Sequence, residues 1–248
     1  MNDPVELHVA SAYLGAPPAG GLEADPSTLT TQAVEWANRD VMLPPGLIER
    51  CRQIYLSASP SGAAQVGVIG VTSAWAREGR TSVALGMAAA LAADSSDQTL
   101  LVECDFEQIP LARIVGAPSN RGLADWLDGT TSPPLVQTAS LDNLVVLCAG
   151  ASFVNPTRAI HRLVQSGLVE ELRSRFRNVV LDLPPLLGVP YGTLAARLAD
   201  RLVLVVRQGV TPIDDVERSI GLVGRERIAG LVLNAEVVKT PRWLRRLM

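Results

Sequence analysis

The chain has 248 residues, of which 48% are hydrophobic but only 4% aromatic. Its core must therefore come from Val, Leu, Ile and Ala, a composition typical of buried parallel strands and small-faced helices. Lys and Arg number 22 against 25 Asp and Glu, a net charge of −3, which excludes a global basic field for nucleic acid and leaves only local contacts with an anionic membrane.

The cysteines and apolar segments bear on the compartment. Cys51, Cys104 and Cys148 are widely spaced among apolar residues, with neither a CxxC pair nor nearby histidines, so we predict reduced core thiols rather than a zinc site. The longest apolar run, residues 83–93, is too short to cross a bilayer of about 30 Å, and the N-terminus lacks a signal-like apolar core. We therefore expect a cytoplasmic protein.

The chain divides into three parts by composition. Residues 1–45 are rich in Pro, Gly, Ala, Ser and acidic residues without sustained periodicity, which predicts a flexible leader. Residues 46–238 are expected to form the main domain, which opens with a helix over residues 47–56. Residues 239–248 form a short basic amphipathic tail.

Short apolar segments predict strands, and helical patterns lie between them. The expected strands are residues 66–72, 99–104, 143–148, 178–183, 201–207 and 228–234. The expected helices are residues 81–93, 122–126, 157–176, 191–198 and 212–223. This alternation predicts an α/β domain with a mainly parallel sheet and helices on both faces, in which ligands bind at the carboxyl ends of the strands.

The loop after the first strand, residues 72–82, reads TSAWAREGRTS. A loop in this position cradles phosphate in α/β nucleotide proteins, because its backbone N–H groups and the helix N-terminus point at the anion. The standard pattern G-x-x-x-x-G-K-[ST] is met only at Gly79 and Thr81, since Ala74 replaces the first glycine and Arg80 replaces the lysine.

The loop nevertheless resembles the Walker A motif of bacterial tyrosine kinases (BY-kinases), where Thr-Ser, two variable residues and Pro-Gly-Glu-Gly-Lys-Ser/Thr follow an apolar strand. The matching residues are Thr72, Ser73, Glu78, Gly79 and Thr81. Further segments resemble the family in the same order: LLVECDFE at 100–107, GLADWLDG at 122–129, the Walker B segment VVLDLPP at 179–185, and GLVLN at 230–234. This ordered set identifies the chain as a member of the family.

The resemblance implies a P-loop NTPase-like fold related to MinD and ParA, and a nucleotide site for ATP or ADP with Mg²⁺. The residues that correspond to nucleotide contacts are Glu78, Gly79, Arg80, Thr81, Ser82 and Asn234. Thr81, Asp105 and Asp182 correspond to the Mg²⁺ ligands, and the two aspartates also correspond to the catalytic pair.

Several residues depart from the family pattern. The guanidinium of Arg80 is longer and planar, so it does not replace the compact lysine charge beside the phosphates. Arg77 replaces a loop glycine, which costs about 1–2 kcal/mol if the position requires a left-handed backbone. Glu103 stands for the first aspartate of the second motif, and Glu107 for its arginine. These changes predict weak or lost kinase activity. They leave two alternatives for the site, which either still binds ATP or ADP with Mg²⁺ or binds no nucleotide.

The tail and the first helix bear on partners. BY-kinases end in a tyrosine cluster, whereas no tyrosine follows Tyr191 here. Residues 241–248 instead place Trp243, Leu244 and Leu247 among arginines, which favours either weak contact with anionic lipid or packing on the chain's own domain. Residues 49–55 resemble the Glu-x-x-Arg-x-x-Arg oligomerisation motif of the family loosely, which leaves a homo-oligomer open.

The leading hypothesis is a regulatory or assembly protein for exopolysaccharide or capsule biosynthesis and export. It would act with a membrane polysaccharide co-polymerase at the inner face of the cell membrane, with weak or lost kinase activity. One alternative is an active ATP-dependent protein-tyrosine kinase or ATPase, and another is a positioning ATPase of the MinD/ParA type. The sequence argues against the positioning ATPase, because the early lysine of the MinD/ParA signature is missing and Ala76 and Arg77 stand near its place.

Overall fold

The computed structural model describes residues 43–58, 67–117, 122–127, 136–138, 141–150 and 155–235. Of the expected leader, only residues 43–45 belong to this part, and the expected tail at 239–248 lies outside it. The domain boundaries at 45 and 238 therefore stay predictions.

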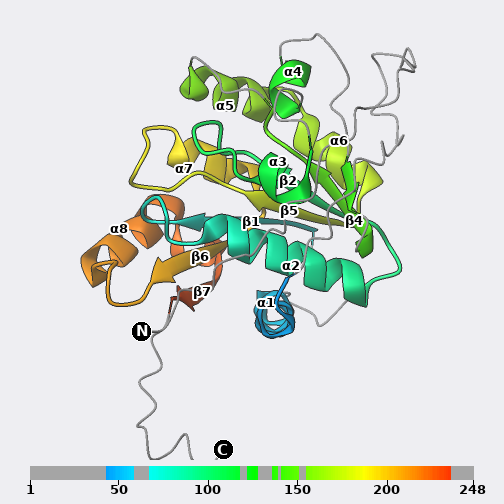
Figure 1. The fold of residues 1–248 in the computed structure, drawn as a ribbon. Helices are drawn as coiled ribbons and strands as arrows, with labels where there is room; N and C mark the ends of the chain where they lie inside the picture. The colour runs from blue at the N-terminus through cyan, green and yellow to red at the C-terminus, as the bar shows by residue number, and fades with distance from the viewer. Residues whose placement is uncertain are drawn as a thin grey trace, which may run out of the picture.

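A seven-stranded sheet in the order β3-β4-β2-β5-β1-β6-β7 forms the centre of the molecule (Figure 1). Its strands are β1 (Gly67–Ser73), β2 (Thr99–Glu103), β3 (Val136–Thr138), β4 (Leu141–Leu147), β5 (Asn178–Asp182), β6 (Arg201–Arg207) and β7 (Ile228–Asn234). All neighbouring strands are parallel except the short edge strand β3, which is antiparallel to β4. The structure thus confirms the mainly parallel sheet and adds β3, which is too short to show a periodic pattern.

The longer helices are α1 (Pro45–Ala58), α2 (Arg80–Asp94), α5 (Pro156–Gln165), α6 (Leu168–Arg175) and α8 (Ile213–Val223). The shorter ones are α3 (Leu111–Val115), α4 (Leu123–Leu127) and α7 (Gly192–Ala195), with 3₁₀ turns η1 (Ala196–Leu198) and η2 (Arg225–Arg227). The prediction of a single helix over residues 157–176 is wrong, because Gly167, with φ 70°, separates α5 from α6. The helix expected over 191–198 is also divided, into α7 and η1.

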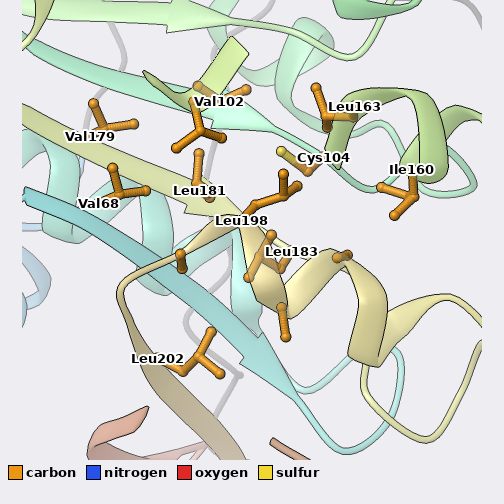
Figure 2. Packing of buried hydrophobic residues seen from close by; sticks show 14 of the residues in the cluster. Val68, Val102, Cys104, Ile160, Leu163, Val179, Leu181, Leu183, Leu198 and Leu202 are labelled. Atoms are coloured by element: carbon orange, nitrogen blue, oxygen red, sulfur yellow. The ribbon is translucent and has the colours of Figure 1, made fainter. Parts of the chain in front are cut away.

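Helices cover both faces of the sheet, as predicted. Helices α1, α2 and α3 pack on one face, where α2 contributes a run of buried alanines. A Cβ on Gly86 of α2 would lie 2.6 Å from the Sγ of Cys51, so this glycine allows α1 to approach α2 closely. Helices α4 to α8 cover the other face, where Val68, Val179 and Val102 lie on adjacent strands (Figure 2).

Three observations complete the fold. Cys51, Cys104 and Cys148 are buried free thiols, which confirms the expectation that they belong to the core. Burial raises the pKa of the Cys51 thiol to about 11, so this thiol stays protonated at neutral pH. None of the helices in the described ranges is long and apolar enough to cross a membrane.

Candidate functional site

The loop between β1 and α2 lies at the carboxyl edge of the sheet, where the sequence predicts the site. Strand β1 is flanked by β5 and β6, and β5 by β2. In the register of these strands Val71 lies opposite Asp182, and Asp182 opposite Glu103. The last residues of β5 and β2 therefore lie level with Val71 of β1, two residues before that strand ends at the loop.

The loop has a left-handed backbone at two positions. Gly79, with φ 96°, caps the N-terminus of α2, and Arg77 has φ 63°. The expectation that Arg77 occupies a position suited to glycine is thereby confirmed. Because Arg77 is exposed and its side chain is not needed in the core, the strain of about 1 kcal/mol falls on the backbone of the loop alone.

Arg80 forms a buried ion pair with Asp105. Its Nη2 donates to the Oδ2 of Asp105 at 2.8 Å, and the two side chains are only 6% and 4% exposed. Its Nη1 lies 3.4 Å from the Oγ of Ser73 at the end of β1. The guanidinium thus turns from the start of α2 toward the end of β2 and joins the loop to the second motif.

The other oxygen of Asp105 is also engaged. Its Oδ1 accepts hydrogen bonds from the backbone N–H groups of Glu107 and Gln108, at 3.0 and 3.1 Å. Asp105 therefore caps the turn that follows β2 and neutralises Arg80 at the same time. Both oxygens of this side chain are thus engaged in contacts within the protein.

Glu103 anchors the end of β2 to two other segments. Its Oε1 accepts from the N–H of Leu111 at 2.8 Å and its Oε2 from the N–H of Ala149 at 3.0 Å. Burial raises the pKa of Glu103 to about 8, and the two backbone donors act against this rise. The longer side chain of glutamate reaches both the start of α3 and the end of β4, so we assign this residue a structural role in the site.

Asp182 retains one free oxygen. Its side chain is buried, and within the described residues its Oδ1 has no hydrogen-bond partner. Burial raises the pKa of Asp182 to about 7, while a hydrogen bond from the Thr81 side chain and the charge of Arg80 lower it. The Pro-Pro segment after Asp182 follows the loop closely, since Pro184 accepts from the hydroxyl of Thr72 at 2.8 Å.

The opposite side of the loop is tied to β6, β7 and α8. The carboxylate of Glu78 accepts from the N–H of Trp75 at 3.0 Å and from the hydroxyl of Thr211. The side-chain amide of Asn234 donates to the carbonyl oxygen of Glu78 at 2.9 Å. The indole of Trp75 donates to the Oδ2 of Asp215 at 2.9 Å. Nothing in the sequence signals the roles of Thr211 and Asp215, because both come from segments more than 130 residues further along the chain.

The structure thus divides the residues predicted for the site into two groups. Arg80, Thr81, Asp105 and Asp182 lie together on the β2 and β5 side of the loop. Glu78, Gly79 and Asn234 meet on the β7 side, where a Cβ on Gly79 would lie 2.0 Å from the Nδ2 of Asn234. Ser82 lies half-buried in the first turn of α2.

The predicted Mg²⁺ ligands do not fit a metal ion in this arrangement. Arg80 and two backbone N–H groups use both oxygens of Asp105, which leaves only the free oxygen of Asp182 and the Thr81 hydroxyl. Over the described part of the chain, no three His, Cys, Asp or Glu residues are grouped so that they would hold a metal ion. The positive charge in this site belongs to the Arg80 guanidinium.

A loop of this form between a central parallel strand and a helix, with acidic residues at the adjacent strand ends, defines a P-loop NTPase-like α/β domain of the MinD/ParA kind. The fold of MinD from Pyrococcus furiosus matches with a TM-score of 0.56 and 20% identity, over 67% of this chain and 70% of MinD. The septum site-determining protein MinD of Pyrococcus horikoshii, in complex with Mg-ADP, has the same fold, with a TM-score of 0.54 and 19% identity over 67% of this chain and 69% of that MinD.

Comparison with known sequences shows which family within this class the chain resembles. No protein-family model matches the chain. The chain is 31% identical over 174 residues to the succinoglycan biosynthesis transport protein ExoP of Rhizobium meliloti (strain 1021), covering 67% of this chain and 22% of ExoP. It is 27% identical over 172 residues to the tyrosine-protein kinase CpsD of Streptococcus pneumoniae serotype 4, covering 68% of this chain and 73% of CpsD.

Solved kinase structures agree with these sequences. The VpsO kinase domain matches with a TM-score of 0.66 and 27% identity, over 77% of this chain and 96% of that domain. The chimerical protein CapA2B2 matches with a TM-score of 0.67 and 25% identity, over 76% of this chain and 84% of the chimera. The chain belongs to the BY-kinase family of CpsD-, CapB- and Wzc-like proteins, which is associated with capsule and exopolysaccharide export.

Proposed function

We propose that this chain is a regulatory or assembly member of the BY-kinase family whose kinase activity is weak or lost. The observation that carries the proposal is the buried ion pair between Arg80 and Asp105. In an active site of this kind the residue at position 80 would contact phosphate and Asp105 would serve the metal. Here the two residues neutralise each other.

The ion pair supports loss of phosphoryl transfer for an energetic reason. To contact a phosphate, Arg80 would have to leave Asp105, and the separation of a buried pair is costly because it leaves an uncompensated charge. The hydrogen bonds of Glu78 and Asn234 hold the other side of the loop. The protein's own side chains therefore stabilise the loop on both sides.

The partner that we propose is a membrane polysaccharide co-polymerase. The chain spans about a fifth of the length of ExoP, which is named as a transport protein, so it corresponds to one portion of that longer relative. The similarity to CpsD and to the CapA2B2 chimera favours a chain that pairs with a separate membrane subunit. On this proposal the domain works at the cytoplasmic face of the membrane.

Complementation of a deletion strain tests the proposal. The native chain and the Asp182→Asn variant would each be expressed in the deletion strain, and the exported polysaccharide measured, with protein levels matched by immunoblot. We expect Asp182→Asn to restore export as well as the native chain does, because turnover is not required. Loss of export with Asp182→Asn at a normal protein level would contradict the proposal and favour a catalytic function.

One observation favours the alternative of an active protein-tyrosine kinase or ATPase. Asp182 keeps a free buried oxygen next to the hydroxyl of Thr81, and such an orphaned acceptor is costly in a structure that never uses it. Release of radioactive phosphate from ATP by the native chain, abolished in Asp182→Asn, would establish this alternative. For a positioning ATPase of the MinD/ParA type, the shared fold is the only support.

A further inference from the structure

An apolar strip remains exposed at the β7 edge of the molecule. Val210, in the turn before α8, and Ile213, the first residue of α8, are 61% and 70% exposed, and Leu231 and Leu233 on β7 are 51% and 62% exposed. We call these four residues the β7–α8 strip. Single exposed apolar side chains are common on protein surfaces, whereas a group of large ones in one region indicates a binding surface.

The strand register shows that the strip lies on one face of the sheet. Leu231 and Leu233 pair with Leu204 and Val206 of β6, which belong to the core cluster that α8 covers. Paired residues of adjacent strands point to the same face. Both leucines of β7 therefore point to the α8 side of the sheet, beyond the area that α8 itself covers.

The orientation of α8 shows on which side of the helix Ile213 lies. Asp215 bonds to Trp75, whose loop follows β1, on the far side of β6 from β7. At about 100° per residue, Ile213 and Glu217 lie on the opposite flank of α8 from Asp215. That flank therefore lies on the β7 side of the helix, and Ile213 and the carboxylates of Asp214 and Glu217 are exposed on this part of α8.

Strand β7 is also the last strand of the sheet in the described part of the chain. An edge strand of seven residues with exposed leucines is a surface that native proteins cover or protect. Directly after it, Ala235 has φ 56°, a left-handed conformation that turns the chain out of the strand direction. This left-handed residue therefore ends the strand two residues after Leu233.

The sequence that follows has the chemistry that this strip requires. Trp243, Leu244, Leu247 and Met248 recur at spacings of three and four and would form one apolar side of a helical turn. Arg242, Arg245 and Arg246 complement the carboxylates of Asp214 and Glu217. Six residues, 236–241, span up to about 20 Å when extended, more than the length of α8, which is about 16 Å.

We propose that residues 242–248 pack against the β7–α8 strip of the same chain. The apolar side chains cover Ile213, Leu231 and Leu233, and the arginines face the acidic first turns of α8. A segment of this length is not a stable helix by itself, so its order depends on the docking. Attachment through a short linker gives an effective concentration in the millimolar range, which favours the same chain over a second copy or a lipid surface.

Limited proteolysis of the full chain tests this proposal. Trypsin cleaves after Arg242, Arg245 and Arg246, and mass spectrometry gives the rate of cleavage at these bonds. We expect the double variant Leu231→Asp, Leu233→Asp to raise this rate about tenfold, which corresponds to about 1.4 kcal/mol of docking free energy. Leu56→Asp, at a position 52% exposed on α1, is the matched control and should leave the rate unchanged.

The other occupants give distinct results. Equal cleavage in the native chain and in the double variant, with both folded by circular dichroism, would overturn the proposal. Protection that disappears on dilution would assign the strip to a second copy of the chain. Protection that arises only with vesicles containing phosphatidylglycerol would assign the tail to the membrane surface. Either of these last two results also overturns docking within one chain.

Discussion

Removal of one partner from the Arg80–Asp105 ion pair should destabilise the protein measurably. Replacement of Arg80 by Met keeps most of the side-chain volume and leaves the Oδ2 of Asp105 buried without its partner. Removal of one partner from a buried pair costs about 3–5 kcal/mol. This is a large share of the free energy of unfolding of a typical domain, which is roughly 5–15 kcal/mol. The midpoint of urea unfolding should fall accordingly, at an unchanged m-value.

A double-mutant cycle separates the pair from other effects. Asp105→Asn alone leaves Arg80 as the uncompensated charge, whereas Arg80→Met with Asp105→Asn removes both charges. The loss of unfolding free energy in the double variant should therefore be smaller than the sum of the losses in the two single variants, by about 1–3 kcal/mol. Arg173 and Asp200 provide the control, since they lie at the same 2.8 Å but are 47% and 43% exposed. Arg173→Met should cost below about 1 kcal/mol.

Two results would contradict a strong interaction between Arg80 and Asp105. One is a loss below about 1 kcal/mol for Arg80→Met, which would equal that of an exposed pair. The other is simple additivity of the two single variants, which would show that the charges do not interact.

Three further predictions concern the loop and its acidic neighbours. Asp182 and Glu103 have pKa values raised to about 7 and about 8, so between their ordinary and raised values the folded state binds more protons than the unfolded state. The free energy of unfolding should therefore fall as the pH rises from about 5 to about 8, and urea midpoints of Asp182→Asn should show a smaller fall. Arg77→Gly relieves the left-handed strain and should raise the unfolding free energy by about 1 kcal/mol in the same assay; a decrease would contradict it. Glu103→Gln directs an NH₂ group at a backbone N–H of Leu111 or Ala149 and should cost about 1–3 kcal/mol, whereas an unchanged melting temperature would exclude the anchoring role.

The sequence predicts the sheet well because its central strands are buried on both faces. Strands such as β2 and β5 read as uninterrupted apolar runs, and the acidic residue that ends each run marks the carboxyl edge. Local signals also predict the left-handed position of Arg77, since the family motif has glycine there. The break between α5 and α6 had a signal in Gly167, but the apolar spacing on either side favours one continuous helix.

The internal contacts of the site follow from the three-dimensional structure alone. Arg80 and Asp105 are 25 residues apart, and their pairing depends on where β2 lies relative to α2. Asn234 corresponds to a nucleotide contact by resemblance, yet its amide donates to the carbonyl of Glu78, 156 residues away. Motif spacing identifies which residues gather at the edge of the sheet, whereas side-chain packing decides which of them neutralise each other.

On the proposed function, Arg80 pairs with Asp105 and is not available to contact a phosphate. Calorimetric titration of the native chain with Mg-ATP and Mg-ADP, beside the Arg80→Lys variant, tests it most directly. The account predicts no binding by the native chain and a gain of binding in Arg80→Lys, because the shorter lysine releases Asp105 and restores a compact charge at the loop. Micromolar binding of Mg-ATP by the native chain would contradict the account.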